Sequence, residues 1–132
     1  MRIFVDTSAL YALLDRDDNN HLRAKRGWAD ILNLGHTLVT SNYVLVESFA
    51  LLQNRLGMGA VRGFQEDILP LINIEFVTPA IHQSGVAALL SASRRSLSFT
   101  DCVSFEIMRT TGIKTVFAFD PHFKQQGFPT IP

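Results

Sequence analysis

The chain opens with a short apolar run that ends in an acid, and this run constrains the fold more than any other segment. Ile3, Phe4 and Val5 are followed directly by Asp6. A continuous apolar run with two β-branched residues predicts a strand buried on both faces, as in a parallel sheet covered by helices. Asp6 then stands at the carboxyl end of the strand, where such sheets bind ligands. A turn or helix-cap role explains Asp6 equally well, so its meaning depends on whether other acids gather there.

The rest of the sequence alternates predicted strands with predicted helices. Thr7 or Ser8 is expected to cap the first helix, and Thr100 the last. The predicted strands are Ile3–Val5, Thr37–Thr40, Ile74–Val77, Thr115–Phe119 and Thr130–Ile131. The predicted helices are Ala9–Leu14, His21–Leu34, Tyr43–Leu56, Ala60–Leu69, Ala80–Ala92 and Asp101–Thr111. This order favours a parallel sheet with right-handed crossovers, so we expect a single domain over residues 1–132 with a three-layer α/β/α architecture.

Charge and cysteine content narrow the class of protein. Lysine plus arginine equals aspartate plus glutamate at 12 each, so any nucleic-acid binding must use a local basic patch. The single cysteine, Cys102, forms no internal disulfide, which fits a reducing compartment. Asp6 and Asp15 interrupt the apolar start of the chain, which argues against a signal peptide. No stretch reaches the length of a membrane span. We therefore expect a soluble cytoplasmic protein without a membrane partner.

Glu47 is the only charged residue between Tyr43 and Leu52. Its neighbours three and four positions away are apolar or largely so, which predicts that it lies on an apolar helix face. A glutamate buried on such a face is costly unless it pairs with a base or binds a metal. An ion pair with Arg55 or Arg62 is the structural alternative.

Two further acids are expected at the same edge of the sheet. Asp101 lies in the first turn of a helix, where the helix dipole favours a carboxylate, and Asp120 ends an apolar strand before a proline. Each has a plain structural explanation alone. Together with Asp6 and Glu47, however, they are predicted to gather near the carboxyl ends of the strands, where clustered carboxylates require a cation to remain ionised. Oxygen ligands suit Mg²⁺ or Mn²⁺, and no histidine or cysteine spacing indicates zinc.

These positions resemble the PIN-domain nucleases, particularly toxin nucleases of the VapC type, along nearly the whole chain. The matching segments are Phe4–Ser8, Asp15–His21, Val46–Ser48, Phe99–Cys102 and Phe119–Phe123. The resemblance implies a five-stranded parallel sheet and an acidic site that uses Mg²⁺ or Mn²⁺ to cleave single-stranded RNA. The residues that match this site are Asp6, Glu47, Asp101 and Asp120, with Ser8 and Thr100 as supporting residues.

The chain departs from the family pattern at two positions. Family members often carry threonine or serine two residues before the fourth acid, where this chain has Ala118. That difference puts a secondary ligand-orienting contact in question, but not the acids. The proline common before Asn-His in the family is Asn19 here.

The chemistry implied by the resemblance is phosphodiester hydrolysis. A bound cation would orient a water, lower its pKa and stabilise charge in the transition state, while carboxylates position the water. The residues expected to hold the RNA backbone are Arg16, Arg94, Arg95 and Lys124, although each also fits an ordinary solvated surface. The resemblance further implies a cognate antitoxin as partner, and we expect a homodimer.

Two other functions stay open on the sequence. A phosphatase could use Asp6 as nucleophile, but such enzymes usually carry a second aspartate two positions on, where this chain has Ser8. A PIN-like scaffold could bind RNA or protein without cleavage, but scaffolds of this kind usually lack some of the acids. The histidines do not cluster along the sequence and are expected to be structural or exposed; they are His21, His36, His82 and His122.

Overall fold

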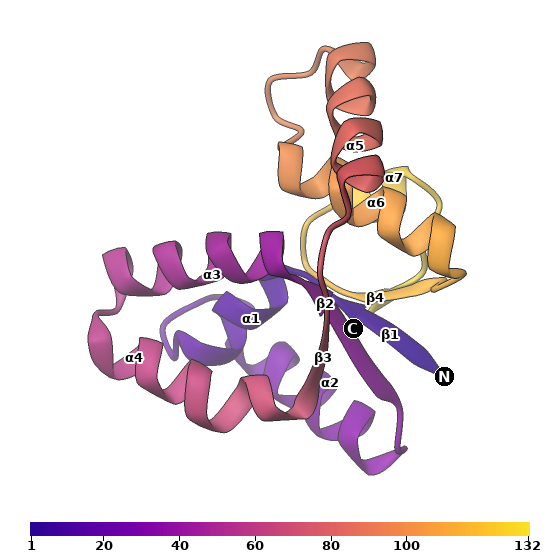
Figure 1. The fold of residues 1–132 in the computed structure, drawn as a ribbon. Coiled ribbons are helices and arrows are strands. Elements are labelled where there is room, and N and C mark those ends of the chain that lie inside the picture. Colours follow the sequence, from indigo (N-terminus) through magenta and orange to yellow (C-terminus); the bar gives the residue numbers. More distant parts are fainter.

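The computed structural model describes all residues 1–132 and contains a five-stranded sheet in the order β3-β2-β1-β4-β5 (Figure 1). Every neighbouring pair is parallel. The strands are β1 (Arg2–Val5), β2 (Thr37–Ser41), β3 (Ile72–Glu75), β4 (Thr115–Phe117) and β5 (Thr130–Ile131). The predicted parallel sheet is therefore confirmed, with the opening apolar run as its central strand.

Helices cover both faces of this sheet, as the three-layer prediction requires. They are α1 (Thr7–Leu14), α2 (His21–Asn33), α3 (Asn42–Arg55), α4 (Met58–Gly63), α5 (Pro79–Ala92), α6 (Phe99–Thr111) and α7 (His122–Gln125). β2 and β3 lie successively further from β1 on one side of the sheet, and the chain then crosses to β4, which lies on the other side of β1. Right-handed crossovers consequently place α1 to α4 on one face and α5 to α7 on the other (Figure 1). No helix has both the length and the apolar character needed to cross a membrane.

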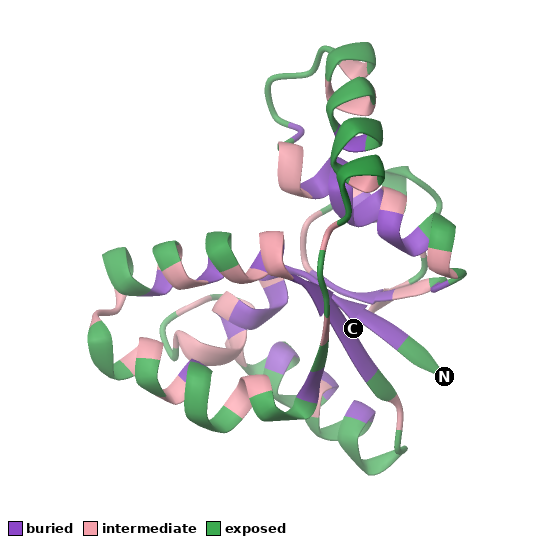
Figure 2. Cartoon of the chain, in the orientation of Figure 1, coloured by how far each residue is buried: buried purple, intermediate pink, exposed green.

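The core lies where the central strands meet the helices, and the buried residues concentrate there (Figure 2). Ile3, Phe4 and Val5 are fully buried, because β1 has a strand on each side and helices on each face. Burial of each such side chain contributes about 1.5–3 kcal/mol to folding. Because the strand is held so firmly, the residue that follows it has a fixed position.

Helix α6 is held close to α5 by a glycine contact. A Cβ added at Gly85 on α5 would lie 2.6 Å from Cγ2 of Val103 on α6, so only glycine allows this approach. Val103 itself is fully buried. The tight packing fixes the start of α6, which carries Asp101.

Most predicted elements differ from the structure by one or two residues at an end, and three differ in a way that matters for the fold. Strand β3 begins at Ile72, two residues before the predicted start, and Phe76, expected within it, is 71% exposed beyond its end. Strand β4 ends at Phe117 instead of Phe119, because the next backbone N–H groups bond to a side chain described below. The predicted helix Ala60–Leu69 is divided into α4, a π-helical turn Phe64–Ile68 and a 3₁₀ turn Leu69–Leu71. Helix α7 was not predicted at all.

Candidate active site

Asp6 lies at the carboxyl end of β1 and caps α1. Its Oδ2 accepts the backbone N–H of Ser8 at 3.1 Å and the Ser8 hydroxyl at 2.5 Å. The predicted cap at Thr7 or Ser8 was therefore wrong, because the acid itself performs this role. Asp6 is buried, and burial raises the pKa of its carboxyl to about 7, against the lowering effect of the Ser8 hydrogen bonds and with smaller raising effects from Asp101 and Asp120.

Ser8 joins two separate strand ends. Its hydroxyl donates to Asp6, and the same oxygen accepts the backbone N–H groups of Phe119 and Asp120 at 3.0 Å and 3.2 Å. These N–H groups would otherwise have continued β4. The sequence at Ser8 thus ends β4 early and brings the Asp120 backbone next to Asp6.

Asp101 is the third residue of α6 and forms a capping box. Ser98 accepts the Asp101 backbone N–H at 3.0 Å, and the Asp101 carboxylate accepts the Ser98 backbone N–H at 3.2 Å. The predicted cap at Thr100 was wrong; Ser98 is the cap. Burial and the negative charge of Asp120 raise the pKa of the Asp101 carboxyl to about 6, while Ser98 and His122 oppose that rise.

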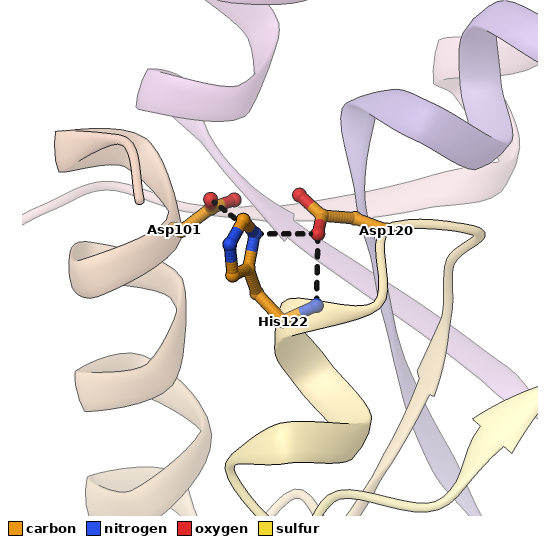
Figure 3. A group of neighbouring side chains, drawn as sticks. All are labelled: Asp101, Asp120 and His122. Carbon is orange, nitrogen blue, oxygen red and sulfur yellow. Dashed lines mark hydrogen bonds and ion pairs between the residues drawn. The ribbon is translucent and has the colours of Figure 1, made fainter. Parts of the chain in front are cut away.

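His122 completes the cluster; it lies in the Phe119–Phe123 segment that resembles the family, but it was expected to be structural or exposed. Its Nδ1 lies 2.7 Å from Oδ1 of Asp120 and 3.6 Å from Oδ2 of Asp101 (Figure 3). Asp120 also accepts the His122 backbone N–H at 2.9 Å. The Nδ1 atom is buried and has no partner in hydrogen-bond geometry. The expectation that the histidines stay outside the site was wrong for His122, because the turn at Pro121 and the short α7 return it to the acids.

Glu47 does not lie on a buried face, so the prediction that it is a lone buried charge was wrong. Residues of α3 that are buried are Val44, Ser48 and Leu52. Glu47 is on another side of the helix, is exposed and makes no ion pair, and its neighbour Val46 is 70% exposed. The alternative partner Arg55 instead places its guanidinium 5.4 Å from the Tyr11 ring.

Glu47 nevertheless lies on a part of α3 that is tied to the site. The hydroxyl of Ser48 donates to Oγ1 of Thr7 at 3.2 Å, next to Asp6. Glu47 also lines a cavity of 290 Å³ together with Thr100, the neighbour of Asp101. These contacts bring the surface of α3 that carries Glu47 next to Thr100, whereas the cluster formed by Asp101, Asp120 and His122 does not include Glu47.

Of the four predicted RNA-binding residues, two contact groups near the acids and two make no contact of this kind. Lys124 lines a cavity that also contacts Asp120, and Arg94 donates to Oε1 of Gln125 on α7 at 3.4 Å. Arg16 and Arg95 are exposed and make no hydrogen bond or ion pair. Arg23 was missed by the sequence reasoning, although it lines the same cavity as Lys124. No sequence pattern separates Arg23 from the other charges on the exposed face of α2.

The donor set fits a hard divalent cation. Single ligand atoms of Asp101, Asp120 and His122 lie within 4.8 Å of one another, and the negative charges of Asp101 and Asp120 both raise the pKa of nearby Asp6. No lysine or arginine forms an ion pair with these carboxylates. A cation would offset the repulsion between these carboxylates, and His122, whose Nδ1 lies 2.7 Å from Asp120, is the only basic group that contacts them.

Comparison with known proteins agrees with this geometry. Residues 3–129 match the family model described as the PIN domain. The chain is 37% identical over 130 residues to the 23S rRNA-specific endonuclease VapC20 of Mycobacterium tuberculosis strains CDC 1551 / Oshkosh and ATCC 25618 / H37Rv, covering 98% of this chain and 97% of that protein.

Solved structures give the same result. The crystal structure of M. tuberculosis VapC20, described as a sarcin-ricin loop cleaving toxin, matches with a TM-score of 0.86 at 36% identity, over 96% of this chain and 95% of that one. VapBC2 of Rickettsia felis, bound to a promoter DNA fragment, shares the fold with a TM-score of 0.71 at 12% identity, over 98% and 97% of the two chains. On both sequence and structure, this chain belongs to the PIN-domain nuclease family, within its VapC-type toxins.

Proposed function

We propose that this protein is a Mg²⁺- or Mn²⁺-dependent endoribonuclease, the toxin of a toxin–antitoxin pair, whose nuclease domain spans residues 1–132. One observation carries the proposal: three buried or half-buried carboxylates from separate elements, Asp6, Asp101 and Asp120, lie together without a lysine or arginine partner. Folding brings these like charges together at a cost, which a bound cation offsets.

In this proposal Asp6, Asp101 and Asp120 hold the ion, with Glu47 contributing from α3 and Thr100 supporting it. When bound there, a divalent ion would supply Lewis-acid stabilisation of charge on the phosphate and would lower the pKa of the attacking water. The chain's own groups arrange the acids. Ser8 orients Asp6, and Ser98 fixes Asp101 through the capping box. An ionised carboxylate then accepts the proton of the attacking water.

The proposed substrate is single-stranded RNA. The basic residues proposed to hold its phosphates are Arg16, Arg94, Arg95 and Lys124. The similarity to VapC20, which is described as specific for 23S rRNA, supports a ribosomal RNA loop as the target. Exposed loop bases suit such a site because they are unpaired and accessible. An antitoxin would neutralise the enzyme in the cytoplasm, and a homodimer is the proposed assembly.

The phosphatase alternative is not favoured by the geometry. The position two residues after Asp6 is Ser8, whose hydroxyl is already engaged with Asp6, Phe119 and Asp120. Asp6 itself is only 3% exposed, which limits direct attack by its carboxylate on a substrate.

The chemistry of the cut ends tests the proposal. Purified protein is incubated with 23S rRNA and Mg²⁺, and the new ends are analysed for phosphate position. Attack by water predicts products without a 2′,3′-cyclic phosphate, whereas attack by the RNA's own 2′-hydroxyl would leave one. Cyclic ends, or no RNA cleavage under any divalent cation, would overturn the proposal; hydrolysis of p-nitrophenyl phosphate without RNA cleavage would favour the phosphatase.

A further inference from the structure

A second cavity borders Asp120 and carries two positive side chains. It has a volume of 160 Å³, and its lining includes Arg23 from α2, Lys124 from α7 and the Ala118–Pro121 segment after β4, with Thr130 and Pro132 completing the wall. The two cations come from helices far apart in the sequence, so the fold, and not a local charge run, brings them together. Asp120, which lines the same cavity, belongs to the candidate active site.

Arg23 is held in place by two contacts. Its guanidinium carbon lies 5.4 Å from the centroid of the Phe119 ring, and Nη1 donates to Oδ1 of Asn20 at 3.4 Å. A cation over an aromatic face is stabilised by the ring quadrupole. Phe119 is in turn fixed by its backbone N–H, which donates to Ser8. The position of Arg23 is therefore coupled to the same hydroxyl that orients Asp6.

Neither positive charge has an acidic partner. Arg23 and Lys124 form no ion pair within 4.0 Å, and Lys124 makes no side-chain hydrogen bond. Most arginine donors thus remain free, although Asp120 lies on the same cavity wall. A planar guanidinium fork beside an ammonium group suits an oxyanion with several acceptor oxygens, above all a phosphate.

We infer that the cavity between Arg23 and Lys124 binds the RNA phosphate next to the one that is cleaved. This inference rests on the proposed ribonuclease function, because a second phosphate beside Asp120 is expected only if a polynucleotide crosses the acidic site. The subsite would set the register of the RNA: once one phosphate is held in this cavity, the neighbouring phosphate of the RNA lies at the acids.

The test measures binding of a short fluorescein-labelled oligouridylate in EDTA, where no metal-dependent cleavage occurs. Affinity is recorded over a range of salt concentrations for the wild type, Arg23→Gln, Lys124→Gln and Arg62→Gln. Arg62, exposed on α4 and without a side-chain hydrogen bond or ion pair, controls for loss of one charge elsewhere. Arg23→Lys tests whether charge alone is sufficient.

The inference predicts that Arg23→Gln and Lys124→Gln each weaken binding by roughly tenfold and lower the slope of log affinity against log salt by about 0.7. Arg23→Lys should keep the slope but lose part of the affinity, since the fork is gone. Arg62→Gln should match the wild type. If both cavity variants behave like Arg62→Gln, the subsite is wrong.

A parallel cleavage assay separates this inference from the proposed function. Wild-type protein that cleaves RNA while its cavity variants bind and cleave normally would overturn the subsite alone. Wild-type protein that cleaves no RNA would overturn the ribonuclease function, and with it the subsite. Circular dichroism of each variant serves as the control for folding, which should be unchanged because Arg23, Arg62 and Lys124 are exposed.

Discussion

The hydroxyl of Ser8 lies 2.5 Å from Oδ2 of Asp6 and donates a hydrogen bond to it. Because the same oxygen accepts the N–H groups of Phe119 and Asp120, one small side chain fixes both an acid after β1 and the backbone of an acid after β4. The carboxylates are thus arranged by hydrogen bonds within the protein, before any cation binds.

Replacing Ser8 with Ala should weaken this arrangement. The variant leaves the N–H groups of Phe119 and Asp120 without their acceptor, which is expected to cost about 1–3 kcal/mol of unfolding free energy. It should also raise the pKa of Asp6 further, since the hydroxyl favours the ionised form. Urea unfolding measures the first effect. Ser84→Ala, at an exposed position on α5, is the control, and equal stability of the two variants would contradict this role.

Stability of the metal-free protein should fall as the pH rises. The pKa of Asp6 is raised to about 7 and that of Asp101 to about 6, from 3.8 in both cases, so the folded state binds these protons more tightly than the unfolded state. The stabilising contribution is complete below pH 4 and is lost as the pH rises through 6 to 7. Asp6 alone accounts for roughly 4 kcal/mol.

Mg²⁺ should reverse this dependence, because it binds the ionised carboxylates. Thermal melts between pH 5 and pH 8, with and without Mg²⁺, measure both trends. The increase in Tm caused by Mg²⁺ should grow with pH, and Asp6→Asn should reduce the pH dependence of the metal-free protein. A metal-free protein that becomes more stable towards pH 8 would contradict the buried-acid account.

Much of this organisation was visible in the sequence, for identifiable reasons. The apolar run Ile3–Val5 predicts a central strand because hydrophobic burial acts through local composition, and Asp6 follows this strand as expected, whereas Asp120 lies three residues after the end of β4. The resemblance to PIN-domain nucleases gave the order of the acids. These features depend on residues close together in the chain.

The features that were missed depend on contacts between distant residues. His122 contacts Asp120 only two positions away, but its approach to Asp101 depends on the fold; β4 ends early because Ser8, over a hundred positions away, takes its N–H groups. Glu47 was misjudged because its apolar neighbours three and four positions away were taken as buried, whereas Ala50 is exposed and Leu51 only half-buried. Arg23 gains its position from Phe119, which no helical pattern reveals.

His122 should contribute to metal affinity. Its Nδ1 lies 2.7 Å from Asp120, so His122→Ala removes a group that orients this acid or joins it as a ligand. Loss of such a group lowers metal affinity by roughly 10- to 100-fold. Isothermal titration with Mn²⁺ measures this change. His36→Ala, at the opposite end of β2 from the acids, serves as control, and equal affinities for the two variants would exclude a role for His122.

Glu47→Gln tests whether Glu47 acts in RNA cleavage or in the stability of the metal-free protein. Because Glu47 is exposed and unpaired, the change should alter the unfolding free energy of the metal-free protein by less than about 0.5 kcal/mol. If Glu47 contributes to the metal site, cleavage should fall by about 100-fold or more and the Mg²⁺-induced rise in Tm should shrink. A variant with wild-type cleavage would remove Glu47 from the site, and a large loss of metal-free stability would indicate a structural pair instead.

The most direct test of the central claim is Mg²⁺-dependent RNA cleavage by Asp101→Asn. Asparagine retains an oxygen that accepts the Ser98 N–H, so the capping box and fold should persist while the charge is removed. Exposed Asp17 provides the matched control in Asp17→Asn. Wild type and Asp17→Asn should cleave RNA with Mg²⁺ and stop in EDTA, while Asp101→Asn, shown to be folded by circular dichroism, should lose about 100-fold or more of the cleavage rate. Wild-type cleavage by Asp101→Asn, or full wild-type activity in EDTA, would contradict it.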